Sequence, residues 1–302
     1  MSAERVVVAL GGNAIAGERG ADPASQEQAV DGACAQIAEL VEHGHEVLIT
    51  HGNGPQVGNL LLKNDLARDV VPPVPLDWCV AQTQATLGFL IVTALERRVS
   101  RTVSTVVTRV LVDADDPAWT KPTKPIGRYL SAEEASERIA AGEAWEERGE
   151  KGWRRMVPSP RPKEILDQRT IDALIREGAI VVAGGGGGIP MVRDDGRLRG
   201  VEAVLDKDLT AALLARTIGA DCLLIATDVE AAAVGYGTER QEWLGAVGRE
   251  RLRALLDAGE FAGGSMGPKV EAMLDFDGRA VITSLERLRE GVEGSAGTQV
   301  TG

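Results

Sequence analysis

Short apolar runs alternate with helical patterns along most of the chain. Runs rich in apolar and β-branched residues predict buried strands at residues 6–10, 46–50, 102–112, 179–183, 222–227 and 279–283. Apolar residues spaced three and four apart predict helices at residues 25–43, 82–98, 164–177, 206–218, 249–258 and 268–276. Such alternation is typical of a mostly parallel central sheet with helices on both faces. The pattern therefore predicts an α/β protein, a three-layer αβα sandwich.

The alternation is interrupted between residues 113 and 162. This stretch is rich in charge and proline, carries three of the five tryptophans, and has one helical pattern near residues 132–142. It is longer than an ordinary connection between elements. We therefore expect a single domain over residues 1–302, with residues 113–162 inserted in it as a lid subdomain.

Charge and cysteine content limit the partners and the cellular compartment that we expect for the chain. The net charge of −12 would repel nucleic acid and anionic membrane surfaces, so we expect neither as a partner. The sequence shows no signal-peptide pattern and no run of eighteen apolar residues. Its three cysteines are far apart and lack CxxC spacing, which argues against disulfides and against a zinc site. These features fit a cytoplasmic protein without metal ligands of its own.

Three glycine clusters directly follow predicted strands. They are Gly11-Gly12-Asn13, Gly52-Asn53-Gly54 and the run at 184–188. Ligands of open α/β sheets collect at the carboxyl ends of the strands, and glycine lets backbone amides approach an anion closely. One such loop is equally explained by a tight turn, but three at one edge favour phosphate or another small anion. The signatures GxxxxGK[ST] and GxGxxG are absent.

Three lysines stand where an anion would bind. Lys124 lies in the insertion, Lys207 starts a predicted helix between Asp206 and Asp208, and Lys269 follows a glycine-rich segment. Each alone would be interpreted as a surface lysine. Together with the glycine loops, they supply the positive charge that phosphoryl transfer requires. No Ser/His/Asp or Cys/His arrangement competes, so we predict phosphoryl transfer between a nucleotide and a very small acid.

Several longer motifs carry a resemblance to a known family. They include VVVALGGNAI at 6–15, THGNGPQVGNLLLKND at 50–65, PTKPIG at 122–127, DKDL at 206–209 and GSMGPK at 264–269. With these and further segments in family order, the sequence resembles the carbamate kinases of the amino acid kinase superfamily over essentially the whole chain. GGN is shared with sister kinases, whereas the combination of the other motifs is far more specific.

The resemblance implies reversible phosphoryl transfer between ATP and carbamate, giving ADP and carbamoyl phosphate, with Mg²⁺ as the cofactor. In many organisms this reaction runs towards ATP, as part of arginine metabolism. The resemblance also implies a homodimer with a sheet continuous across both subunits, and a mobile lid over the carbamate site. Two departures concern the lid and the nucleotide side: Arg128-Tyr129 replaces the usual Pro-Phe, and Glu230-Ala231-Ala232-Ala233 precedes Gly235-Tyr236-Gly237.

The resemblance also assigns roles to individual residues. Residues implied to hold the transferring phosphoryl group or the carbamate are Gly11, Gly12, Asn13, Gly52, Asn53 and Gly54. Residues implied in catalysis are Lys124, Lys207 and Lys269, with Asp208 orienting the lysines. Residues implied in nucleotide binding are Gly185, Gly186, Gly187, Gly188, Asp228, Tyr236 and Met266. From the residues alone, packing of Tyr236 against the protein is an equal alternative to stacking on a base.

Two other functions stay open from the sequence. The first is a sister kinase of another small acid on the same scaffold, and the second is a catalytically silent paralogue that binds nucleotide or carbamoyl phosphate. Lys124, Lys207, Asp208 and Lys269 are all present, which argues against the silent paralogue.

Overall fold

The computed structural model describes residues 3–17, 22–261 and 265–301, and its centre is an eight-stranded sheet. In spatial order the strands are β15 (Ala246–Gly248), β17 (Thr298–Thr301), β16 (Arg279–Ser284), β12 (Cys222–Thr227), β1 (Arg5–Leu10), β2 (Glu46–His51), β9 (Ile180–Val182) and β3 (Val103–Thr105). Neighbouring strands are parallel except β16 and β17. The mostly parallel sheet expected from the sequence is thereby confirmed.

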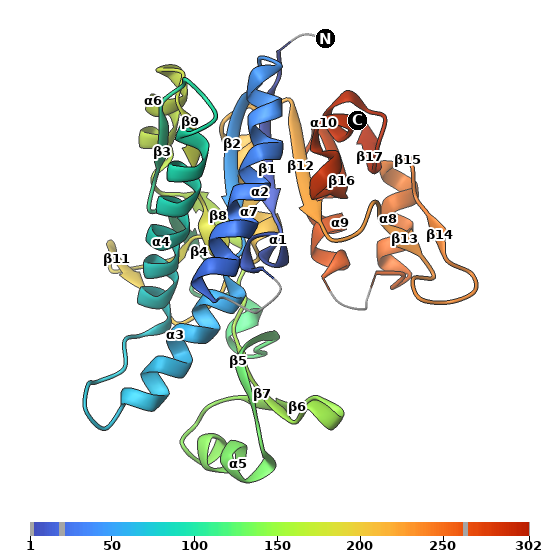
Figure 1. The fold of residues 1–302 in the computed structure, drawn as a ribbon. Coiled ribbons are helices and arrows are strands. Elements are labelled where there is room, and N and C mark those ends of the chain that lie inside the picture. The colour runs from blue at the N-terminus through green and yellow to red at the C-terminus, as the bar shows by residue number, and fades with distance from the viewer. Residues whose placement is uncertain (1–2, 18–21, 262–264, 302) are drawn as a thin grey trace.

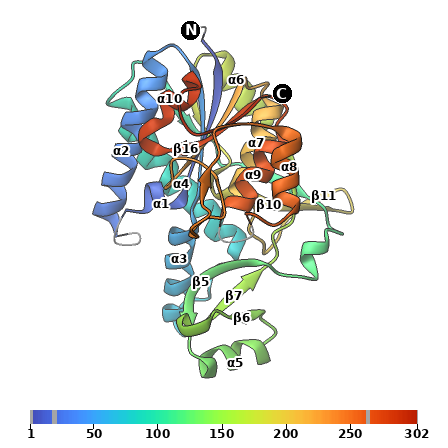
Figure 2. The same cartoon turned by 90° about the vertical axis from the view of Figure 1, so that its right-hand side faces the viewer.

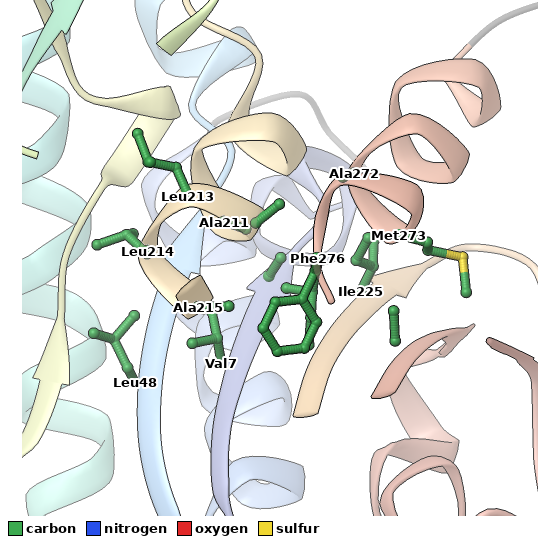
Figure 3. Close-up of a cluster of buried hydrophobic side chains, with 14 of the residues drawn as sticks. Val7, Leu48, Ala211, Leu213, Leu214, Ala215, Ile225, Ala272, Met273 and Phe276 are labelled. Atoms are coloured by element: carbon green, nitrogen blue, oxygen red, sulfur yellow. The ribbon is translucent and has the colours of Figure 1, made fainter. Parts of the chain in front are cut away.

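Helices cover both faces of this sheet (Figure 1). Those of the main body are α1 (Gly12–Ala16), α2 (Pro23–Glu42), α3 (Gly54–Ala67), α4 (Leu76–Glu96), α6 (Gln168–Arg176), α7 (Lys207–Thr217), α8 (Arg249–Asp257), α9 (Met266–Asp275) and α10 (Leu288–Glu293). Side chains of β1 alternate between the faces: Val6 and Val8 pack with α2, α4 and α10, while Val7 packs with α7 and α9. Figure 3 shows this second cluster, in which Val7 and Leu48 lie beneath Leu214 and Ala215. The result is the predicted three-layer αβα sandwich.

A second, four-stranded sheet flanks the main one. Its spatial order is β11 (Arg197–Gly200), β10 (Ile189–Asp194), β4 (Arg109–Val112) and β8 (Pro162–Ile165). The antiparallel pair β4–β8 places Val112 opposite Pro162, so the chain leaves the body and returns to it at one point. A short ribbon of β13 (Ala233–Val234) and β14 (Glu242–Trp243) completes the body.

Between β4 and β8 the chain builds a small separate sheet. It contains β5 (Lys124–Leu130), β7 (Trp153–Val157) and β6 (Trp145–Glu147), all antiparallel, with α5 (Ala132–Ala140) packed beside them. Figures 1 and 2 show these elements extending from one end of the body, away from both termini. Ile126 of β5 and Val157 of β7 share a hydrophobic cluster with Val57 of α3, so this sheet rests on α3.

Most predicted elements form, and their boundaries show where the pattern was misleading. The expected strand at 102–112 is two strands, β3 and β4, which belong to different sheets. The helix expected at 82–98 begins already at Leu76, and the helix expected at 164–177 begins only at Gln168 because β8 occupies residues 162–165. Helix α3 was not predicted at all.

Candidate active site

A deep cleft lies at the carboxyl ends of β1, β2 and β12. It has a volume of about 1110 Å³, and loops from the main sheet, the starts of α7 and α9, and the small sheet of β5 and β7 all line it. Predicted site residues that line it are Gly11, Gly12, Gly52, Asn53, Gly54, Lys124, Gly186, Lys207, Asp208, Asp228 and Lys269. Residues distant in sequence therefore meet in one place, as the position of the glycine loops predicted.

The floor of the cleft is formed by backbone atoms, because the glycine loops that follow the strands touch one another. A Cβ atom on Gly52 would lie 2.9 Å from the Gly12 nitrogen, and one on Gly186 would overlap the Asn53 amide. Gly186 also has a φ of +64°, which only glycine adopts readily. The Gly11 amide donates to the Ala226 carbonyl at 3.1 Å. That N–H therefore joins β1 to β12, while Gly11 itself borders the cleft.

The start of α7 sets the positive side of the cleft. Asp206 caps this helix: its Oδ1 accepts hydrogen bonds from the backbone amides of Asp208 at 2.9 Å and Leu209 at 3.4 Å. Lys207 and Asp208 thus occupy the first turn, and α9 brings Lys269 beside them. Asp208 accepts from Lys207 Nζ at 2.5 Å and from Lys269 Nζ at 3.1 Å.

These three side chains form a buried ion triad. Side-chain exposures are 4% for Asp208, 12% for Lys207 and 6% for Lys269. Burial lowers the pKa of Lys207, Asp208 opposes this shift, and the charge of Lys269 adds to it. One carboxylate between two ammonium groups leaves an excess of positive charge away from water. Such a site attracts an anion, since uncompensated buried charge is costly.

The small sheet contributes a third lysine to the same helix start. Lys124 Nζ at the beginning of β5 lies 2.6 Å from Asp206 Oδ2. Burial would raise the pKa of Asp206, but Lys124 and Lys207 outweigh burial and lower it, so Asp206 is a carboxylate. Sequence reasoning treated Asp206 only as a flank of Lys207. Its position directly before a helix was the available signal, because Asp is a preferred N-cap.

Several candidates for nucleotide binding lie outside the cleft lining. Gly185, Gly187 and Gly188 are buried against His51, Leu205 and Val110 respectively, so in that run only Gly186 borders the cleft. Tyr236 is 64% exposed and packs edge-on against Trp243, with ring centroids 6.3 Å apart. Met266 packs against the hydrophobic core. The Asn13 side chain lies outside the described residues.

Histidine and cysteine chemistry does not contribute to this site. Burial lowers the pKa of His51 to about 4, and its Nδ1 lies 2.9 Å from the Gly52 carbonyl, so the ring is neutral and holds the loop. Burial raises the pKa of the Cys34 and Cys222 thiols to about 12, which leaves them unreactive. Within residues 3–17, 22–261 and 265–301, no three His, Cys, Asp or Glu side chains are grouped to hold a metal ion.

Comparison with known proteins shows the family to which the chain belongs. The sequence profile of the amino acid kinase family matches residues 4–284. The chain therefore belongs to the amino acid kinase family. Proteins to which it is similar over nearly its whole length include carbamate kinases.

A carbamate kinase of Pyrococcus furiosus is 44% identical, covering 98% of this chain and 99% of its own length. One from Halobacterium salinarum is also 44% identical, with 97% of each chain covered. The structure of a Giardia lamblia carbamate kinase bound to AMP-PNP superposes with a TM-score of 0.93 at 38% identity, covering 99% of both chains. These matches confirm the resemblance and the fold that it implied.

Proposed function

We propose that this chain catalyses reversible phosphoryl transfer between ATP and carbamate, giving ADP and carbamoyl phosphate. The observation that carries the proposal is the buried Lys207–Asp208–Lys269 triad beside a backbone-lined floor. A carbamate oxygen attacks the γ-phosphorus in line; the new O–P bond forms as the bond to the β-phosphate oxygen breaks. Carbamate is already an anion, so no general base is needed, in agreement with a neutral, buried His51.

Charge neutralisation and positioning are then the catalytic requirements. ATP and carbamate repel each other, and the two triad ammonium groups offset this repulsion at the transferring oxygens. Asp208 fixes both lysines before substrate arrives, so little reorganisation is needed during transfer. Lys124 of β5 adds a third ammonium group at the start of α7, where it is paired with Asp206.

A small acceptor fits the floor better than a larger one. Gly52 and Gly12 touch, and Gly54 begins α3 directly beside them, so the loop leaves room for a compact anion. The main alternative is a kinase of another small acid, such as acetylglutamate or aspartate, whose side chain would need a wider floor. A silent paralogue that only binds its ligands has little need of the complete triad.

Magnesium is proposed as a companion of the nucleotide. Mg²⁺ is held by one or two carboxylates together with substrate phosphates, and bound there it would neutralise phosphate charge. Asp228 and Glu286 line the cleft at the ends of β12 and β16 and are suitable carboxylates. Two carboxylates beside the cleft fit a metal ion that is held mainly by the phosphates of ATP.

We also propose that residues 113–162 act as a lid subdomain. They leave and rejoin the body at the β4–β8 pair, where Lys163 and Asp113 form an ion pair. Lys124 near the start of the insertion reaches Asp206 of the body. A segment whose two ends meet at one place and that carries a cleft lysine is suited to close over the acceptor.

A homodimer in the cytoplasm completes the proposal. Trp78 and Phe89 lie three turns apart on one face of α4 and are 60% and 63% exposed. The same helix is long and apolar enough to cross a membrane by composition, but half of that window is buried in the body, as in a core helix. Beside α4, β3 forms an edge of the main sheet. A second copy would cover this apolar face and extend the sheet.

The activity prediction uses the purified chain with ADP, Mg²⁺ and carbamoyl phosphate. We expect ATP to form, and Lys207→Ala to lower turnover by about a hundredfold to a thousandfold with the fold retained, because preorganised charge is lost. Removing Mg²⁺ with EDTA should stop the reaction. Near-normal turnover by a folded Lys207→Ala variant, or transfer to acetylglutamate or aspartate instead of carbamate, would contradict the proposal.

The lid prediction uses a deletion of residues 117–160 with a short linker. The ends meet at β4–β8, so the body should fold, while transfer is abolished because Lys124 is lost. Binding of ADP, measured by calorimetry, should persist. Loss of ADP binding in a folded deletion would show that the segment is structural.

The dimer prediction uses Phe89→Glu, with Leu66→Glu as the control because Leu66 is 79% exposed at the far end of α3. Sedimentation velocity should show a dimer for the unaltered chain and for the control, and a monomer for Phe89→Glu. A monomer in all three samples would contradict the proposed dimer.

A further inference from the structure

Two neighbouring arginines of β7 have very different surroundings. Arg155 lies 3.5 Å from Glu143 and 3.6 Å from Glu202, and it lines a separate cavity of about 340 Å³ beside α3. Arg154, on the other face of the strand, lines the main cleft. In the part of the chain that the structure describes, no carboxylate lies within 4.0 Å of it. Glu146, its partner across the β6–β7 pair, is bound to Arg148 at 3.0 Å instead, so Arg154 brings to the cleft wall a positive charge without an ion-pair partner in the described part of the chain.

The Arg154 side chain is nevertheless held in place. One of its terminal nitrogens donates to the Tyr129 hydroxyl at 3.3 Å, and its guanidinium carbon lies 5.0 Å from the centre of the Tyr129 ring. Its Nε is buried and has no hydrogen-bond partner among the described residues. A buried donor without a partner costs free energy, and such a group calls for an explanation.

The other cations of the insertion that line the cleft are already paired. Lys124 contacts Asp206 at 2.6 Å, and Arg148 contacts Glu146 at 3.0 Å. Arg154 thus combines three properties: it borders the cleft, its planar donor group is fixed by an aromatic ring, and it lacks a counter-charge. This combination matches a guanidinium prepared to bind an anion.

The position of β7 indicates which anion it meets. Val157, three residues further along β7, packs with Val57 in the first turn of α3. That helix begins at the Gly52–Gly54 loop after β2, whereas Asp228 and Glu286, the residues proposed to meet Mg²⁺ and ATP, follow β12 and β16 on the other side of β1. Arg154 therefore stands on the acceptor side, within the segment that also carries Lys124.

We propose that Arg154 binds the anionic acceptor, carbamate or carbamoyl phosphate, and that Tyr129 acts as its positioning residue. This inference rests on the proposed function and specifies its acceptor subsite. The Tyr129 hydroxyl holds one terminal nitrogen, Nη1, and leaves the other terminal nitrogen, Nη2, to donate to the substrate. Binding of the anion supplies the counter-charge that the structure lacks around Arg154.

The test compares the KM values of the full chain and its variants for carbamoyl phosphate and for ADP. Arg154→Gln should raise the KM for carbamoyl phosphate roughly tenfold to a hundredfold, the range for a charge-assisted hydrogen bond, and leave the KM for ADP within about twofold. Arg154→Lys should be intermediate, because it keeps the charge without the planar donors. Tyr129→Phe should raise the same KM about twofold to tenfold.

Arg128→Gln is the matched control, since Arg128 precedes Tyr129, lines the other cavity and is paired with Glu134. It removes one positive charge from the same hairpin and should change neither KM. If Arg154→Gln is folded and active and its KM for carbamoyl phosphate is unchanged, this inference alone is overturned. If Arg154→Gln does not fold, an unchanged KM for carbamoyl phosphate in both Arg154→Lys and Tyr129→Phe overturns it in the same way. If the KM for ADP rises as much as the KM for carbamoyl phosphate, Arg154 contacts the nucleotide, and the inference is also overturned. No ATP formation by the unaltered chain overturns the proposed function and this inference together.

Discussion

The site depends on one carboxylate that holds two ammonium groups away from water. Asp208 bonds Lys207 from its own helix turn and Lys269 from α9, a residue 61 positions later. Burying an excess of positive charge is expensive, so the surrounding structure must fix it. The N-cap Asp206 fixes the start of α7, and the αβα sandwich fixes α7 against α9. The cleft, its glycine-lined floor and the insertion all border the place where this positive charge attracts an anion.

Much of the fold followed from the sequence because its central strands are almost entirely buried. Residues of β1, β2, β12 and β16 are apolar on both faces, which produces the continuous runs from which they were predicted. The division of residues 102–112 into β3 and β4 could not be read in this way. Gln84 of α4 holds the backbone of Thr108 from both sides, at 2.7 and 3.1 Å, and so turns the chain from one sheet to the next. A contact between residues 24 positions apart leaves no periodic pattern.

The site shows the same division between local and distant signals. Lys207, Lys269 and the glycine loops were predictable because each stands next to a strand end or a helix start, whereas Lys124 was noted only for its place in the insertion. The Lys124–Asp206 pair joins residues 82 positions apart, and the isolation of Arg154 depends on which face of β7 meets the cleft. The Gly11 amide is a related case, since it donates to the carbonyl of Ala226 in the neighbouring strand. The residue types indicated the chemistry of the site, whereas the fold determines which hydrogen-bonding partners each of these residues has.

The central claim is that the triad acts as one catalytic unit, and a double-mutant cycle tests it most directly. The turnover number for ATP formation from carbamoyl phosphate and ADP would be measured for Asp208→Asn, Lys269→Met and the double variant, each checked for folding. We predict a loss of about a hundredfold or more for each single change. The double variant should be little worse than the poorer single variant, because residues that act together lose their effect together. A loss equal to the product of the two single losses would contradict this account.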